Sequence, residues 1–320
     1  LNEAVDVIKN HYRDKEYFLA NAYLPPQQVK DGIVTIQVLE GKIGKVGLNM
    51  AGNARLKERV ARDILDTHLP AGSLITESGI EKPLLLTNDL PGVTVRSTLK
   101  PGTGLGEADL EVHVGDEGRL FTGSIELNNM GNRNTGKNRL SGTVNARNLT
   151  GYGDLLTVRA LLAEDEGTTL GRISYAIPVG ARGSKLIASY SRLGYKLGET
   201  FANLNADGNA DVYSVYVQHP IIRSRNNNLF LLAGYDRKEL VDKQFNGANR
   251  EERRLDNLLF ALRGDFRDDL GGGALNNYSI GLTLGDVDNL KVPADPHKLS
   301  LIHISEPTRL LSISYAVFCL

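Results

Sequence analysis

The stretch TVNARNLTGYGDLLTVRALL, from Thr143 to Leu162, decides the fold of the longer part of this chain. On each side of a compact Gly-Tyr-Gly-Asp turn, apolar and polar residues alternate, as in Val144 and Asn145. A period of two residues sends alternate side chains to opposite faces of a strand, so the stretch predicts a β-hairpin. Its polar side is mixed and holds no nucleophile, which is typical of a wall and not of a catalytic site.

The same period of two continues from Arg119 to about residue 290, without intervening helices. Nine segments carry it: 119–129, 139–148, 154–163, 170–179, 185–194, 211–219, 228–237, 257–266 and 276–285. Strands of this length suit a soluble sandwich, a soluble barrel or an outer-membrane barrel, whose strands have roughly 9–11 residues. Long connections at Asn129–Asn138, Tyr195–Ala210 and Lys238–Asp256 alternate with shorter ones, an asymmetry that favours the membrane barrel.

Residues 1–118 mix helical and strand-like segments. From Asn53 to Leu69, Leu56, Val60 and Ile64 have helical spacing, and Asn53 is the expected N-cap. A second helix is expected after Thr76, with strand-like runs before and after the helical pair. The sequence therefore predicts an α+β unit in the order strand, helix, helix, strand, strand. An upstream helix, strand and strand indicate an internal repeat whose first copy is truncated.

Composition excludes several classes of function. A net charge of −1 gives no bulk attraction for nucleic acid. The glycine-rich Gly102–Glu107 precedes a strand, so we interpret it as a hairpin connection and not as a nucleotide site. Six scattered His and a single Cys319 predict no catalytic set, no metal site and no cofactor. Asp207–Val212 lacks the later ligands of a calcium loop, and Asn249–Asp256 is densely charged, so both are interpreted as solvated loops.

Three stretches give the chain a resemblance to a known family: AYLPPQQVKDGIVTIQVLEGKIGKV (22–46), NRLSGTVNARNLTGYGDLLTV (138–158) and YAIPVGARGSKLIASYSRLGYKLG (175–198). The chain resembles the outer-membrane transporters of bacterial two-partner secretion, the haemolysin secretion and activation type. The resemblance implies α+β periplasmic repeats, called POTRA domains, followed by an antiparallel transmembrane β-barrel, of which about nine of sixteen strands are expected here. The implied domains are residues 1–42, the end of a first POTRA domain; 43–118, a second POTRA domain; 119–290, the N-terminal half of the barrel; and 299–320, a non-native tail.

The resemblance also implies a function, which is translocation of an unfolded secreted exoprotein across the bacterial outer membrane. An open sheet edge can add an extended peptide as a further strand, so the edge of the second POTRA domain is the expected binding site. Its candidate residues are Val93, Val95, Ser97 and Leu99. The expected channel-facing residues are Thr122, Glu126, Asn145, Arg147 and Arg159. Expected partners are the exoprotein and outer-membrane lipid, with no nucleic acid, no nucleotide and no enzymatic activity.

Two departures from the family pattern and several alternatives stay open. The family's Val-Arg-Gly-Tyr/Phe motif has no match, and nine strands cannot close a sixteen-stranded barrel, so the chain as it stands is expected to be inactive. Leu299–Leu320 differs in texture and is interpreted as translated adapter sequence, with a genuine tenth strand as the alternative. The alternative functions are an assembly or insertase barrel of the same superfamily, a passive porin-like barrel, and a soluble two-domain binding protein.

Overall fold

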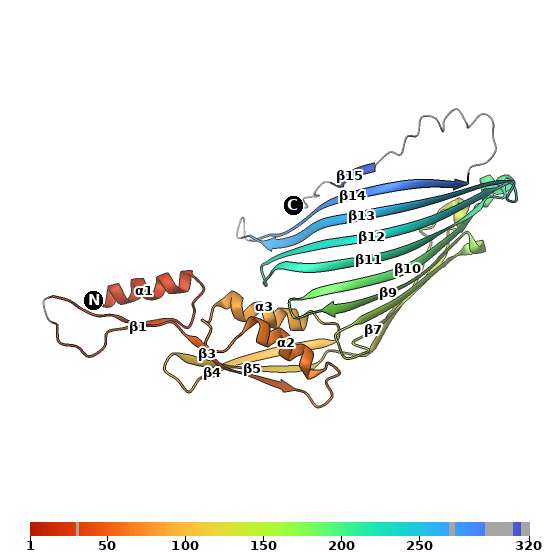
Figure 1. The fold of residues 1–320 in the computed structure, drawn as a ribbon. Helices are drawn as coiled ribbons and strands as arrows, with labels where there is room; N and C mark the ends of the chain where they lie inside the picture. Colours follow the sequence, from red (N-terminus) through yellow and green to blue (C-terminus); the bar gives the residue numbers. More distant parts are fainter. Residues whose placement is uncertain (30–31, 269–272, 292–309, 315–320) are drawn as a thin grey trace. The chain divides into compact units, whose positions relative to one another are not determined.

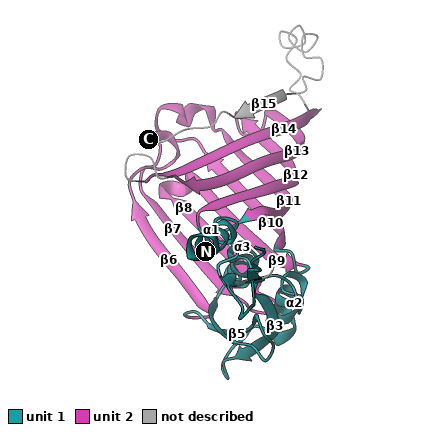
Figure 2. Cartoon of the chain, turned by 90° about the vertical axis from the view of Figure 1, so that its left-hand side faces the viewer, with its two compact units in different colours: residues 1–118, 180–183, 223–225 teal, residues 119–179, 184–222, 226–320 magenta. Residues whose placement is uncertain are grey.

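The computed structural model describes residues 1–29, 32–268, 273–291 and 310–314. These residues divide into two compact units (Figure 2). Unit 1 comprises residues 1–118 with the short segments 180–183 and 223–225, and unit 2 comprises the remainder. The helices in this described part of the chain are all too short or too polar to cross a bilayer.

Unit 1 begins with one helix and two very short strands (Figure 1). Helix α1 spans Asn2–Asp14, and strands β1 (Asn21–Tyr23) and β2 (Gln37–Leu39) form an antiparallel pair. The expected order of helix, strand and strand is confirmed. The strands are shorter than the sequence pattern indicates, because Pro25 and Pro26 follow β1 and cannot donate to a ladder.

A three-stranded sheet and two helices form the rest of unit 1. Its elements follow the predicted order: β3 (Lys42–Met50), α2 (Glu58–His68), α3 (Glu77–Asn88), β4 (Val93–Pro101) and β5 (Glu107–Asp116). The sheet order is β3-β5-β4, with β5 parallel to β3 and antiparallel to β4. The glycine-rich segment after Pro101 connects β4 to β5, which confirms the hairpin interpretation.

The two helices begin differently. Helix α3 follows Thr76 as expected, and Thr76 is its N-cap, since its Oγ1 accepts a hydrogen bond from the Gly79 amide at 3.1 Å. The expectation that Asn53 caps α2 is wrong, because Lys57 is the N-cap. The preceding residues form a turn instead, in which the Arg55 amide donates to Asp116 Oδ1 at 2.9 Å.

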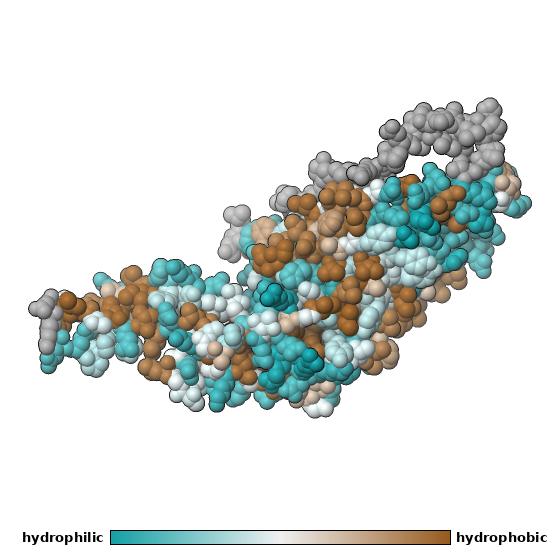
Figure 3. Space-filling view, in the orientation of Figure 1, coloured by the Kyte–Doolittle hydropathy of each residue, from teal (hydrophilic) through white to brown (hydrophobic). Residues whose placement is uncertain are grey.

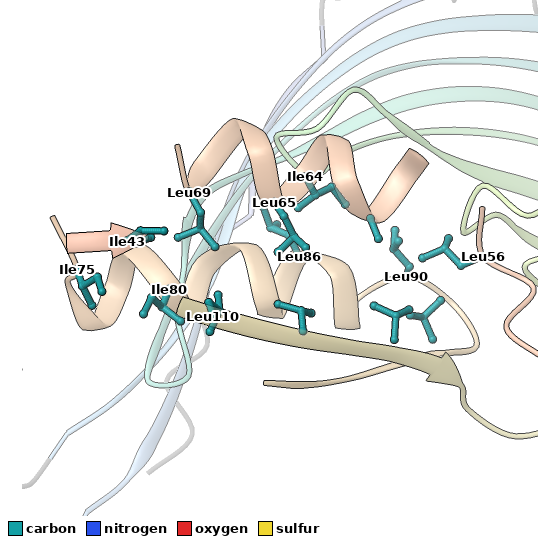
Figure 4. Close-up of a cluster of buried hydrophobic side chains, with 14 of the residues drawn as sticks. Ile43, Leu56, Ile64, Leu65, Leu69, Ile75, Ile80, Leu86, Leu90 and Leu110 are labelled. Atoms are coloured by element: carbon teal, nitrogen blue, oxygen red, sulfur yellow. The ribbon is translucent and has the colours of Figure 1, made fainter. Parts of the chain in front are cut away.

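The core of unit 1 lies between the two helices and the sheet (Figure 4). Helix α2 contributes Ile64 and Leu65, which are 3% and 1% exposed, and α3 contributes Leu86. Leu110, on the central strand β5, faces them from the sheet. Burial of one such side chain stabilises a fold by about 1.5–3 kcal/mol, so this core stabilises unit 1.

Unit 2 is one antiparallel sheet in which each strand pairs with the next along the chain, from β6 to β15. Nine strands lie within the predicted barrel region: β6 (Phe121–Asn128), β7 (Arg139–Arg147), β8 (Leu155–Ala163), β9 (Thr168–Val179), β10 (Ser184–Lys196), β11 (Asp207–Arg223), β12 (Asn227–Gln244), β13 (Asn249–Arg267) and β14 (Leu275–Lys291). Short 3₁₀ segments η1 (Arg133–Thr135), η2 (Glu164–Glu166) and η3 (Glu199–Leu204) interrupt three connections. The nine predicted strands are therefore confirmed.

The later strands are longer than predicted. The expected long connection Lys238–Asp256 is wrong, because β12 and β13 pair continuously from Gln244 and Asn249 onward. The interpretations of Asp207–Val212 and Asn249–Asp256 as solvated loops are wrong too, because these residues lie in strands β11 and β13. Charged residues in these segments pair across strands, as Arg253 does with Asp242 at 3.1 Å, so polarity did not end the strands.

The proposed tail, Leu299–Leu320, lies mostly outside the described residues. Leu310–Ser314 form the short strand β15, which pairs with β14. The interpretation of this tail as non-native stays a prediction.

Candidate functional site

The sheet of unit 2 has one apolar face. The register places Val144 opposite Val158, and Val158 opposite Ile173. These side chains are 53%, 45% and 47% exposed, although β-branched residues of this kind are normally buried. Figure 3 shows hydrophobic residues gathered along the middle of the strands and hydrophilic ones at the far end of the long hairpins. A continuous exposed apolar face of this size indicates contact with something other than water.

The opposite face of the same strands is polar. It holds the predicted channel-facing residues together: Thr122 lies opposite Asn145, and Asn145 opposite Thr157, whose Oγ1 donates to Asn145 Oδ1 at 2.7 Å. Glu126 and Arg147 share this face by alternation. Arg159 lies on it too, two residues along β8 from Thr157. The structure thus brings the five residues onto one face, and their contact with a channel stays a prediction.

Tyrosines and charged residues lie at the margin of the apolar face. On β10 and β11, Tyr190 donates to Asp211 Oδ1 at 2.6 Å, and Arg192 lies 3.6 Å from the same carboxylate. On β12 and β13, Tyr235 and Arg237 both donate to Asp256, the arginine at 2.9 Å. Outward tyrosines above an apolar band are typical of strands that cross the headgroup region of a membrane. The charges farther along the strands then lie beyond the apolar band.

The turn between β7 and β8 is held by buried polar groups. Asn148 and Asp154 are 1% and 0% exposed. Asn148 Oδ1 accepts from the Gly153 amide at 2.8 Å, and Asp154 Oδ1 accepts from the Thr150 hydroxyl at 2.6 Å and amide at 3.0 Å. Asn148, Gly151 and Gly153 have φ of 55°, 83° and 77°, a left-handed conformation that Gly and Asn tolerate best.

The environment of Asp154 favours its charged form. Burial by itself raises the pKa of the carboxyl, but the hydrogen bonds from Thr150, from the backbone of Asp154 and from Tyr175 together lower it by more. The pKa of Asp154 therefore lies below its usual value, and the ionised carboxylate belongs to the folded turn.

The predicted binding strand of unit 1, β4, is an edge strand of its sheet. In an antiparallel pair, alternate residues direct their main-chain groups to the neighbour and away from it. The Val95 amide points away from β5, because it donates to Asn88 Oδ1 at 3.1 Å. Val93, Ser97 and Leu99 share its orientation by alternation. All four candidate residues thus turn their main-chain groups to the outer edge of the sheet.

Only part of this edge is unoccupied. The Val93 amide donates to Leu90 O at 3.1 Å, and the Val95 amide donates to Asn88 Oδ1. Within the described residues, the outward amides of Ser97 and Leu99 have no such partner, and Ser97 is exposed. Sequence reasoning did not identify Asn88 as a cap of the edge, since no local pattern shows that the last side chain of a helix bonds to the strand that follows it.

The other edge of this sheet is irregular. Strand β3 changes register between Ile43 and Val46. At its start the Ile43 amide donates to Ser73 O at 2.9 Å, and Ile43 O accepts from Gly72 at 2.7 Å. A bulged and partly covered strand is a poorer template for pairing than the regular strand β4.

Within the described ranges, no three His, Cys, Asp or Glu side chains are grouped closely enough to hold a metal ion. Sequence reasoning also passed over Arg172, which the register places directly opposite Arg159. The signal that could have identified it is its even position in a strand whose odd positions are apolar.

A small α+β unit followed by a long antiparallel sheet with one apolar and one polar face defines the POTRA-plus-barrel class. The model of the haemolysin secretion/activation protein ShlB/FhaC/HecB family matches residues 106–276, and that of the ShlB-type POTRA domain matches residues 1–41. The first match covers more than half of the chain, so the chain belongs to the haemolysin secretion/activation family. The predicted resemblance and fold class are confirmed.

Among curated relatives, the heme/hemopexin transporter protein HuxB of Haemophilus influenzae is 28% identical over 289 residues, covering 90% of this chain and 50% of its own length. The outer membrane transporter CdiB of Dickeya dadantii is 28% identical over 157 residues, which are 48% of this chain and 26% of that protein. The chain thus spans about half the length, or less, of the curated relatives it matches.

Two solved structures share the fold. CdiB from Escherichia coli superposes with a TM-score of 0.70 at 17% identity, over 93% of this chain and 54% of that one. CdiB from Acinetobacter baumannii superposes with a TM-score of 0.65 at 18% identity, over 90% and 53%. At such identities the likeness concerns the fold alone.

Proposed function

We propose that this protein is a two-partner secretion transporter of the bacterial outer membrane, with its POTRA domains in the periplasm. In this proposal the POTRA edge captures an unfolded secreted exoprotein, and the polar face of the sheet guides that chain to the cell surface. The observation that carries the proposal is the two-faced sheet: exposed Val144, Val158 and Ile173 on one face and hydrogen-bonded polar residues on the other. Family membership and the names of HuxB and CdiB as transporters support it.

The apolar face fits a hydrocarbon solvent. In a barrel that spans the membrane, lipid-facing and lumen-facing residues alternate along every strand. Val158 would then contact lipid while its neighbour Arg159 faces water. A wall of Thr, Ser, Asn and Arg offers transient hydrogen bonds to a passing polypeptide, with a few apolar side chains such as Leu161 and Leu170 between them. The role is transport without catalysis, and the proposal invokes no nucleotide and no cofactor.

The edge of β4 fits capture of an unfolded partner. Main-chain hydrogen bonds from Ser97 and Leu99 would bind an extended segment with little demand on its sequence. The partly covered edge at Val93 and Val95 would limit the bound segment to the second half of the strand. We retain residues 1–42, 43–118 and 119–290 as the proposed domains.

The proposal predicts that a gene for a large secreted exoprotein lies beside this one. The test is secretion of that exoprotein, measured by immunoblot of the culture medium and cell surface. Ser97→Pro removes one outward amide while leaving the ladder with β5 intact, and proline is tolerated on such an edge. We expect this variant, in the protein as its source bacterium produces it, to lower secretion several-fold.

Ser97→Ala is the matched control, because it keeps the amide and should secrete normally. Normal secretion by Ser97→Pro, at equal protein abundance, would contradict the role of this edge. Normal secretion after deletion of the whole gene would contradict the transport function itself.

A further inference from the structure

The strands of unit 2 differ in charge between its two halves. Strands β7, β8, β9 and β10 contain no Asp and no Glu. Their basic residues are Arg139, Arg147, Arg159, Arg172, Lys185, Arg192 and Lys196. Strands β12 and β13 carry both signs along their length. Strands β7–β10 are therefore basic, whereas β12 and β13 are mixed in charge.

Two of these arginines stand directly opposite each other. Arg159 pairs in register with Arg172, and this row continues to Thr143 on one side and Ser191 on the other. Both arginine side chains are exposed, on the polar face of the sheet. Like charges placed directly across two strands are destabilising, so the arrangement needs either water or an anion between them.

Other arginines of the sheet are neutralised within it. Arg192 lies 3.6 Å from Asp211, and Arg237 lies 2.9 Å from Asp256. On the same polar face as Arg159, Arg253 lies 3.1 Å from Asp242. Arg159 and Arg172 have no carboxylate partner among the described residues. The pair thus differs from arginines that serve only to join strands.

We propose that Arg159 and Arg172 form a binding site on the channel wall for carboxylate side chains of the unfolded polypeptide in transit. This inference rests on the proposed function and adds a chemical preference to it, which is a preference for acidic segments. Each guanidinium presents a planar fork of N–H donors that matches a carboxylate. The two guanidinium groups, on adjacent strands, can bind one carboxylate together or one carboxylate each. Thr143 and Ser191 supply hydroxyls on either side of the pair.

The expected binding is weak, and that suits a conduit. An exposed ion pair contributes little in water, because solvent and salt screen it. A carboxylate would therefore be held briefly and released to the next position. The charge pattern guides an acidic segment along β7–β10, and a lysine-rich segment finds no equivalent row of acids on those strands.

The experiment uses the complete protein in detergent and two fluorescent unfolded peptides of equal length, one rich in Glu and one rich in Lys. Fluorescence anisotropy at low ionic strength gives their affinities. The Arg159→Gln/Arg172→Gln variant should bind the Glu-rich peptide about three- to tenfold more weakly than the parent protein, because two exposed ion pairs are lost. Binding of the Lys-rich peptide should not weaken, and added salt should abolish the difference.

Arg192→Gln/Arg237→Gln is the matched control, since it removes two arginines that lie on the other face and already have carboxylate partners. Equal loss of Glu-rich binding in this control would overturn the proposal, as would unchanged binding in the Arg159→Gln/Arg172→Gln variant. A lowered unfolding temperature of that variant without peptide would overturn it too, because an acidic group of the protein itself would then occupy the pair. Exoprotein secretion is measured in parallel. Intact secretion with an unaltered peptide preference would contradict only the arginine site, whereas secretion that does not require the gene would contradict the transport function.

Discussion

Unit 1 covers its apolar side chains with its own helices, whereas unit 2 leaves them exposed along a single sheet. Leu65 of α2 is 1% exposed, and Val112 of β5 is 0% exposed. On unit 2, Val158 and Ile173 are nearly half exposed although they occupy the centre of their strands. The comparison indicates that unit 1 is stabilised by burial of its apolar side chains away from water, whereas the apolar face of unit 2 requires a solvent that is itself apolar. The same residue types thus have opposite surroundings in one chain.

The largest effect is expected in the core of unit 1. Leu65→Ala should lower the free energy of unfolding of this unit by about 2–5 kcal/mol, because it leaves a cavity that the helices fill only in part. Circular dichroism during urea titration of the complete protein measures it. Arg59→Ala, whose side chain is 87% exposed, should change the value by no more than about 0.5 kcal/mol. Equal effects of the two changes would break the comparison.

The second effect sharpens the contrast between the faces of the sheet. Ile125→Arg places a charge on the apolar face of β6 and should destabilise insertion into lipid vesicles by about 2–4 kcal/mol. Its neighbour Ser124 faces the polar side, so Ser124→Arg should insert almost normally. Urea-dependent folding into vesicles measures both. If the serine variant were the more damaging one, the assignment of the two faces would be reversed.

The smallest effect concerns the buried turn between β7 and β8. Asp154→Asn should cost about 1–3 kcal/mol at neutral pH, because the charge-assisted hydrogen bonds from Thr150 weaken. The pKa of Asp154 lies below the usual 3.8, so its contribution is complete above that pH and is lost as the pH falls through the lower folded value.

Parent and Asp154→Asn stabilities, measured by urea unfolding at several pH values, should therefore converge in acid. Leu149→Ala, at an exposed position of the same turn, should show no such pH dependence. A gap that widened in acid would show that the folded turn holds the protonated carboxyl.

Much of this architecture is predictable from local pattern. The period of two along residues 119–290 predicted all nine strands, since alternation reports which face each side chain occupies. The start of α2 was not predictable, because a hydrogen bond from Arg55 to the distant Asp116 fixes the preceding turn. The length of β12 and β13 was not predictable either. Their outer halves are polar on both faces, and cross-strand ion pairs such as Arg254 with Glu239 join the ladder in place of apolar contacts.

The candidate site was predictable in part. Alternation placed Thr122, Asn145 and Arg159 on one face correctly, as the register shows. It could not reveal that Arg172 stands opposite Arg159, because cross-strand register depends on the geometry of the turn between β8 and β9.

The Asn88 side chain on the Val95 amide has a further consequence. It leaves β4 with a footprint of only a few residues, so a bound strand would form few hydrogen bonds at once. Few bonds mean a short dwell time, and a carrier that must pass a long chain onward gains more from rapid exchange than from tight capture. The same cap removes half of the edge from reach of a second sheet, which protects the unit from pairing with its own copies.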